Sequence, residues 1–173
     1  MEGRARLGGA RGAGAGADGH GLEAGRDGAA EVRLAGYAAL FGRRDAGRDM
    51  IRPGAFARTL AERTEPLPLF WQHRPDQRIG WIESVAEDAR GLRVIARIDN
   101  PDGGAGAALR RGAVTGLSFG YRARGFTRDA AGRELTDIEL FEISLVTRPM
   151  QHAARVHLIS NSSPARGGGS PQG

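Results

Sequence analysis

The chain has no cysteine, no lysine and no long apolar run, and the first and last of these absences each exclude a class of protein. With 0 Cys among 173 residues, neither a disulfide framework nor a thiolate metal site can form. No run of about 18 apolar residues occurs, which excludes a transmembrane helix, and the N-terminus lacks the apolar segment of a signal peptide. The histidines and acids show no metal-ligand spacing, and no glycine loop has a phosphate-binding form. We therefore expect a soluble cytoplasmic protein without cofactor, metal or membrane partner.

All 25 basic residues are arginine, and the formal net charge is +5. Between positions 31 and 159, 20 arginines are interspersed with 16 acidic residues. Blocks of like charge and basic patches with interleaved aromatics, which are typical of nucleic-acid-binding proteins, are absent from the sequence. The pattern indicates a solvated surface of mixed charge and no specific nucleic-acid partner.

The two ends of the chain differ in composition from its middle. Residues 1–30 contain 10 Gly and 8 Ala, and residues 160–173 are rich in Gly, Ser and Pro. Such segments bury too little apolar surface to offset the loss of chain entropy, so we expect both to be disordered tails. The predicted folded domain covers residues 31–159.

Apolar alternation in the middle segment predicts a β-rich domain with two short helices. Turn residues at 87–91 and 129–132 predict two hairpins, and residues 42–49 form a polar loop. The expected strands are 31–41, 67–71, 78–85, 91–98, 116–124, 134–147 and 155–159, and the expected helices are 51–60 and 101–112. This order favours a barrel or closed sheet over a doubly wound fold.

Ser118 lies in the segment Gly116-Leu-Ser118-Phe-Gly120-Tyr121, where the strand period places it on one face between two glycines. Glycines at these positions weaken a strand without a gain in packing, and they indicate close approach of a substrate backbone. A face of small residues covered by a helix is the common structural alternative. The pattern alone leaves both interpretations open.

His73 ends the apolar run Leu69-Phe-Trp-Gln-His73. At the mouth of such a strand an imidazole is partly desolvated yet within reach of a partner, as a general base requires. A surface histidine that caps a strand is the alternative. Of the other histidines, His20 lies in the Gly/Ala-rich segment, and His152 and His157 lie near the end of the domain.

Glu142 lies in a strand, Ile138–Val146, whose two faces are both largely apolar. A strand of this kind is covered on both sides, and a carboxylate within it needs a charged or hydrogen-bonded partner. That partner is either an arginine or His73. Since a serine hydroxyl is activated by an imidazole that a carboxylate orients, Ser118, His73 and Glu142 are the candidate groups for acyl transfer.

A series of short motifs occurs in a fixed order between residues 34 and 158. The motifs are Gly36-Tyr-Ala-Ala-Leu-Phe41, Asp49-Met-Ile-Arg-Pro-Gly-Ala-Phe56, the run ending in His73, Ile79-Gly80, Gly91-Leu92, Gly116–Tyr121, and Leu140-Phe-Glu-Ile-Ser-Leu-Val-Thr-Arg-Pro149. This series resembles the prohead proteases of tailed bacteriophages and of phage-derived gene transfer agents. The resemblance implies a serine endopeptidase that cleaves capsid or scaffold protein, and its own tails as a further substrate, inside the assembling prohead.

The resemblance also implies a fold and three site residues. The family is similar to herpesvirus assembly proteases, which implies a mainly β fold with a few helices, a closed β-barrel ringed by short helices, and often a homodimer. By position, Ser118 matches the nucleophile, His73 the general base and Glu142 the third member. In the herpesvirus relatives the third member is a histidine, which leaves His152 as a rival. For the oxyanion, backbone N–H groups near Gly120 and the side chain of Arg122 or Arg124 are candidates.

Two other classes of function are compatible with the sequence. One is a non-catalytic capsid-assembly or scaffold module in which the three residues are vestigial. The other is a basic β-domain that binds nucleic acid. Because all three positions hold chemically competent residues, the sequence favours the enzyme.

Overall fold

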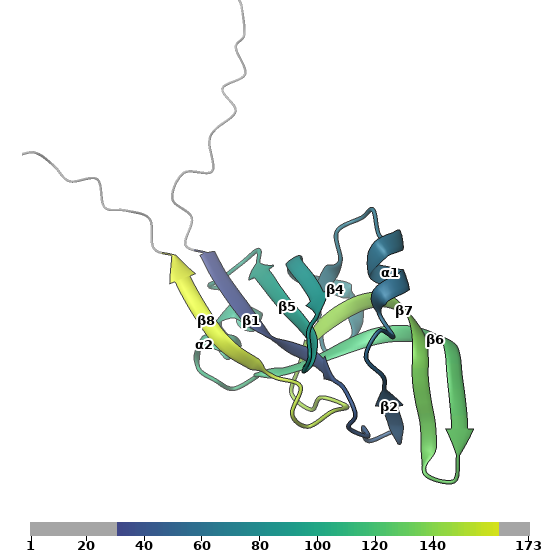
Figure 1. Cartoon of the computed structure of the whole chain (residues 1–173). Helices are drawn as coiled ribbons and strands as arrows, with labels where there is room; N and C mark the ends of the chain where they lie inside the picture. Colours follow the sequence, from purple (N-terminus) through teal and green to yellow (C-terminus); the bar gives the residue numbers. More distant parts are fainter. Residues whose placement is uncertain (1–30, 163–173) are drawn as a thin grey trace, which may run out of the picture.

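The computed structural model describes residues 31–162 (Figure 1). Eight strands and two short helices occur in this part of the chain. In order they are β1 (Glu31–Leu40), β2 (Asp49–Ile51), α1 (Ala57–Glu62), β3 (Pro68–Trp71), β4 (Arg74–Glu87), β5 (Gly91–Ile98), α2 (Gly104–Arg110), β6 (Gly116–Asp129), β7 (Gly132–Val146) and β8 (Val156–Ser162). The expectation of a mainly β protein with a few helices is confirmed.

All eight strands belong to one strongly bent sheet. Strand β7 lies between β6 on one edge and the short strands β2 and β3, which pair with it in parallel, on the other. From β3 the sheet continues through β4, β5 and β1 to β8 in antiparallel pairs. Figure 1 shows β1 beside β8, so the first and last strands of the described chain are neighbours.

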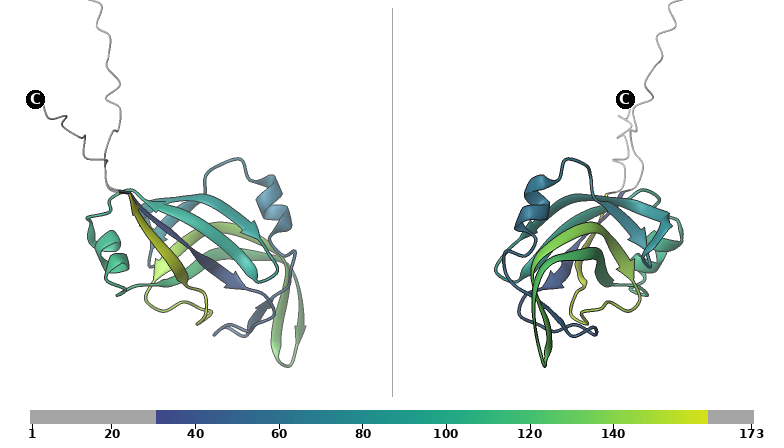
Figure 2. Two further views of the ribbon diagram at one scale, coloured as in Figure 1. Left: turned by 60° about the vertical axis from the view of Figure 1, so that its left-hand side comes forward. Right: turned by 90° about the vertical axis from the view of Figure 1, so that its right-hand side faces the viewer.

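The predicted closure of this sheet into a barrel is wrong. Strands β6 and β8 approach each other only at their beginnings, through the isolated bridge between Gly116 and Arg155. Leu117 N–H donates to the carbonyl of Ala154 at 2.9 Å, and β6 then continues with β7 alone. The two form a long hairpin that projects from the rest of the sheet (Figure 2). Since β6 leaves with its hairpin partner, no continuous ladder joins the two ends of the sheet.

Helix α1 fills a gap on the edge of β7 between β2 and β3. Ile138 N–H donates to the carbonyl of Ala55 at 2.9 Å, and Leu140 N–H donates to Thr59 Oγ1 at 3.1 Å. The helix and the turn before it therefore satisfy backbone groups on this edge of β7 that no strand reaches. It begins later than predicted because Ile51 joins β2 and the turn after it, with Gly54 at φ +89°, precedes the first helical residue.

The other predicted elements occur with shifted ends. The hairpins at 87–91 and 129–132 form, and Gly112, with φ +68°, follows α2 as a C-terminal glycine should. Strand β4 begins at Arg74 and β8 continues to Ser162, past the expected domain end at 159. The predicted tails at 1–30 and 163–173 lie outside the described residues.

The bend of the sheet encloses one hydrophobic core. Alternation in β5 buries Leu92, Val94, Ala96 and Ile98 on a single face. The largest fully buried side chains come from nearly every element: Leu34, Ile51, Phe56, Leu67, Leu69, Leu92, Leu109, Leu117, Leu135, Ile138, Leu140 and Ile143. This core fixes β3, β6 and β7, the strands that carry the candidate site residues.

Candidate active site

A two-residue turn between β3 and β4 presents His73. Gln72 and His73 have φ angles of 53° and 58°, and Trp71 pairs with Arg74 across the turn. Positive φ at both central positions is the geometry of tight hairpin turns, yet it is uncommon for residues other than glycine, and only Asn, Asp and His are enriched there. Backbone strain of this kind persists only where the surroundings impose it, and it clusters at functional sites.

Strand β7 holds this turn in place. Gln72 N–H donates to the carbonyl of Leu145 at 3.0 Å, and His73 N–H donates to Ser144 Oγ at 3.2 Å. The side-chain oxygen of Gln72 also accepts the N–H of Thr147 at 3.2 Å. The imidazole is thereby held above the outer face of β7.

A β-bulge in β7 places Glu142 on that outer face. Gly120 pairs with Glu142, but its neighbour Tyr121 pairs with Leu140, so Phe141 is an extra residue. Side chains opposite each other in register share a face. The core side of β7 therefore changes from even to odd positions: Ile138 and Leu140 before the bulge, Ile143 and Leu145 after it. The sequence pattern suggested two continuous apolar faces because it does not reveal this change of phase.

The carboxylate of Glu142 binds the imidazole of His73. The distance from His73 Nδ1 to Glu142 Oε1 is 2.6 Å, and the second oxygen, Oε2, accepts the hydroxyl of Ser144 at 2.6 Å. The Glu142 side chain is 12 % exposed and that of His73 is 42 % exposed. Within residues 31–162 no arginine forms an ion pair with Glu142. Of the two partners that the sequence left open, the structure supplies the imidazole.

Ser118 lies on the same face, one strand away. It pairs in register with Ser144, and Gly120 pairs with Glu142, so these four positions form two adjacent rows across β6 and β7. Ser118 is 3 % exposed, and its hydroxyl makes no hydrogen bond to another residue of the described chain. His73 Nε2 likewise has no protein partner within residues 31–162. Neither atom is therefore committed to a hydrogen bond within the described chain.

The glycine opposite Glu142 makes room for the carboxylate of that residue. A Cβ atom at Gly120 would lie 2.6 Å from Glu142 Oε1, so the carboxylate passes over this position on its way to His73. At Gly116 the corresponding space is taken by the carbonyl of Val146 and the ring of Pro149. The glycines around Ser118 therefore make room for groups of the protein itself, and the close substrate approach that they suggested stays a prediction.

A small cavity of about 60 Å³ adjoins Ser118. Tyr121 donates its hydroxyl to Asp49 at 2.6 Å, and Arg133 Nε donates to the other oxygen of this carboxylate at 2.8 Å. The Arg133 guanidinium, followed by the Tyr121 hydroxyl, holds the pKa of Asp49 below its usual value, while burial raises the pKa of Asp45. The remaining lining residues are Ala38, Phe119, Met150 and Gln151.

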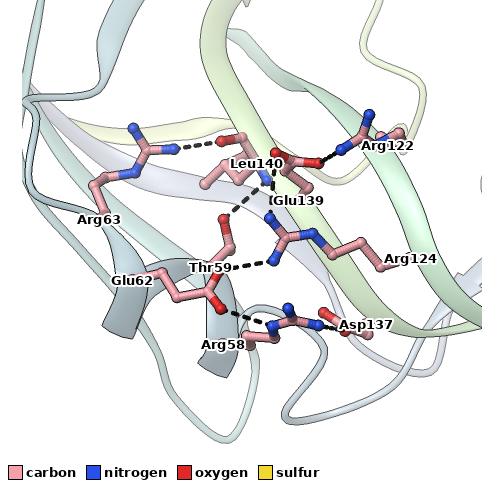
Figure 3. Close-up of polar contacts among 9 residues, drawn as sticks. All are labelled: Arg58, Thr59, Glu62, Arg63, Arg122, Arg124, Asp137, Glu139 and Leu140. Atoms are coloured by element: carbon pink, nitrogen blue, oxygen red, sulfur yellow. Dashed lines mark hydrogen bonds and ion pairs between the residues drawn. The ribbon is translucent and has the colours of Figure 1, made fainter.

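A larger groove of about 380 Å³ lies between α1 and the outer face of β7 (Figure 3). Its floor includes Phe141, which is 49 % exposed and directly precedes Glu142. Arg124 bridges Glu62 and Glu139, and Arg122 pairs with Glu139. We call this set, together with Arg58, the α1 ion-pair cluster. Acidic partners hold both Arg122 and Arg124, so we do not propose either side chain as an oxyanion donor.

His152, the rival for the third triad position, is held elsewhere. Its carbonyl accepts Arg155 Nε at 2.9 Å, and its ring lies 3.5 Å from the same guanidinium. Ser144, by contrast, contacts both His73 and Glu142 and was missed by sequence reasoning. Its spacing of two residues from Glu142 on a strand was the available signal, because that spacing places both side chains on one face.

The part of the chain that the structure covers contains no group of three His, Cys, Asp or Glu side chains arranged to hold a metal ion. None of its helices is long and apolar enough to cross a membrane.

The fold is similar to those of two solved proteases. The KSHV protease in complex with a hexapeptide phosphonate inhibitor superposes with a TM-score of 0.52 at 13 % identity, over 75 % of this chain and 65 % of that one. The bacteriophage T4 capsid assembly protease, gp21, gives a TM-score of 0.51 at 14 % identity, over 66 % and 80 %. At these identities the likeness concerns the fold, which is a mainly β architecture of the herpesvirus-protease type.

The chain belongs to the caudovirus prohead serine protease family, whose model matches residues 22–166. It is 34 % identical over 128 residues to the prohead protease of Enterobacteria phage HK97, covering 70 % of this chain and 57 % of that protein. It is also 27 % identical over 107 residues to a capsid polyprotein of Pseudomonas phage PAJU2, covering 56 % and 16 %. The chain thus spans less than two thirds of the length of either relative.

Proposed function

We propose that this protein is a serine endopeptidase of phage-head maturation in which Ser118 is the nucleophile, His73 the general base and Glu142 the residue that orients the base. The 2.6 Å contact between His73 Nδ1 and Glu142 Oε1, made beside the row that carries Ser118, is the observation that supports it most. Family membership supports the class of reaction.

The proposed mechanism follows from which atoms are committed. Glu142 holds the proton on Nδ1 of His73, so Nε2 is the basic nitrogen. Nε2 accepts the hydroxyl proton of Ser118 as Oγ attacks the peptide carbonyl, and it then returns the proton to the leaving amine. A water molecule then attacks the acyl group as Nε2 accepts its proton. Nε2 returns that proton to Ser118 Oγ as the carboxylic acid product leaves. Backbone N–H groups near Gly120 are the proposed donors to the oxyanion.

The proposed substrates are capsid or scaffold protein, with the chain's own tails as a further candidate, and the proposed place of action is the assembling prohead. This rests on the relatives, which are called a prohead protease, a capsid polyprotein and a capsid assembly protease. The resemblance to herpesvirus proteases also leads us to propose a homodimer.

Labelling by a fluorescent fluorophosphonate tests the mechanism without knowledge of the substrate. Such probes phosphonylate a serine only when a base activates it. We expect a single adduct, located at Ser118 by mass spectrometry of tryptic peptides. Co-expression with the capsid protein of the same phage-like element should also shorten the capsid chain. An unlabelled protein that leaves the capsid intact but co-purifies with it supports the non-catalytic assembly module instead.

A further inference from the structure

We propose that Ser144 is a positioning residue of this site, which fixes the base and its carboxylate in one arrangement by binding both of them. The proposal rests on the protease function proposed above. It concerns a residue that touches neither substrate nor the reacting atoms and acts through His73 and Glu142.

The hydroxyl of Ser144 makes one contact in each direction. It donates its proton to Glu142 Oε2 at 2.6 Å and accepts the backbone N–H of His73 at 3.2 Å. Ser144 is completely buried, so water does not reach these groups from its side. A hydroxyl supplies one donor and two acceptor sites, and this geometry uses the donor for the acid and an acceptor for the backbone of the base.

The first contact fixes the carboxylate. Glu142 uses Oε1 for His73 and Oε2 for Ser144, so the plane of the carboxyl group cannot rotate without breaking one of two short bonds. A fixed carboxylate selects one tautomer and one orientation of the imidazole. Without the Ser144 hydroxyl, Oε2 has no partner within the described chain. The carboxyl group can then rotate about its remaining bond to His73.

The second contact fixes the strained backbone of the base. His73 adopts φ 58°, which costs free energy for a residue other than glycine. Gln72 has its own hydrogen bonds to Leu145 and Thr147, but within residues 31–162 the N–H of His73 is bound by Ser144 alone. Ser144 therefore couples the conformation of the turn to the position of Glu142.

The variant Ser144→Ala removes the hydroxyl and leaves the strand intact. Its matched control is Thr59→Val, which removes another buried hydroxyl that accepts a backbone N–H beside β7, at Leu140, without contact to His73 or Glu142. We expect Ser144→Ala to slow fluorophosphonate labelling of Ser118 by roughly 10- to 100-fold, the range for a misplaced catalytic group. Thr59→Val should lower the Tm by about as much as Ser144→Ala does, but its Ser118 should be labelled at the wild-type rate. Ser144→Thr, which keeps the hydroxyl, should recover most of the rate.

A spectroscopic readout separates this proposal from the protease function itself. In the Ser118→Ala background, which cannot react, the 15N shifts of labelled His73 report the tautomer, with His73→Gln used to assign the signal. We expect a single Nδ1–H tautomer when Ser144 is present and a mixture in Ser144→Ala. If wild-type protein is never labelled but this tautomer change occurs, the protease function fails and the positioning role stands.

Three results overturn the proposal. One is a labelling rate in Ser144→Ala within twofold of wild type. Another is an equal loss of rate in Thr59→Val, because the effect would then follow stability alone. The third is an unchanged His73 tautomer in the Ser118→Ala, Ser144→Ala double variant.

Discussion

Two groups of charged side chains lie on the outer face of β7, and they differ in what they leave unbonded. In the α1 ion-pair cluster every carboxylate has an arginine, and most of its side chains are exposed to water. In the candidate site the contact between His73 and Glu142 is partly buried, and it leaves His73 Nε2 and the Ser118 hydroxyl without a hydrogen-bond partner within residues 31–162. The first arrangement is a solvated set of ion pairs, and the second leaves two polar atoms without a protein partner in that range.

Removal of the nucleophile should have the largest effect. In Ser118→Ala, labelling and capsid cleavage should fall by several orders of magnitude, as when the nucleophile of a serine protease is removed. The Tm should stay close to that of wild type, because the lost hydroxyl makes no hydrogen bond within the described chain. Gel-based cleavage and thermal unfolding measure the two quantities. Normal processing by the alanine variant would rule out the assignment of Ser118.

Loss of the charge on Glu142 should come next. Glu142→Gln keeps the size of the side chain but no longer stabilises an imidazolium, and the labelling rate should fall by about 10²- to 10⁴-fold. Because no arginine pairs with Glu142 in the described chain, the Tm should change little. His152→Gln is the matched test of the rival third member, and it should label at the wild-type rate. Full activity in Glu142→Gln with loss in His152→Gln would reverse the assignment.

Sequence analysis offered His73 as a partner of Glu142, and the structure shows this contact. The strand geometry that it inferred around Glu142 was partly wrong. The composition of the strand required a partner for Glu142, and the motif order indicated which partner it was. The bulge at Phe141 was not predictable, since the change of buried apolar positions from even to odd looks the same in the sequence as a strand with two apolar faces. The open sheet was missed for a related reason, because whether β6 stays beside β8 depends on pairing between distant strands.

The pH dependence of labelling tests the base directly. An imidazole base must be neutral to accept a proton, so the rate should rise about tenfold per pH unit in acid and then level off. Labelling from pH 5 to 8, with unfolding monitored at each pH, gives the profile. A flat profile would argue against His73 as the base.

A buried carboxylate outside the site should affect stability and leave the pH profile of labelling unchanged. Arg133 and Tyr121 lower the pKa of Asp49, so this group stabilises the fold at neutral pH. That contribution should be lost as the pH falls below the unfolded value of about 3.9 toward the lower native value. Asp49→Asn should therefore cost roughly 1–3 kcal/mol at pH 7 and flatten the acid limb of the stability curve. Asp76→Asn, at an exposed ion pair, is the control and should do neither.

The smallest effect is expected in the α1 ion-pair cluster. Arg58 is 59 % exposed and pairs with Glu62 and Asp137, and the variant Arg58→Gln removes both contacts. Exposed pairs of this kind contribute little because water and salt screen them, so urea unfolding should detect little change, and less still at high salt.

The labelling rate of Arg58→Gln should equal that of wild type, since Glu62 keeps Arg124 and the positions of β7 next to Glu142 are unaffected. A tenfold slower rate with unchanged stability would show that the cluster is coupled to His73 through β7. The groove beside Phe141 would then belong to the active site, and the contrast between the two regions would be wrong.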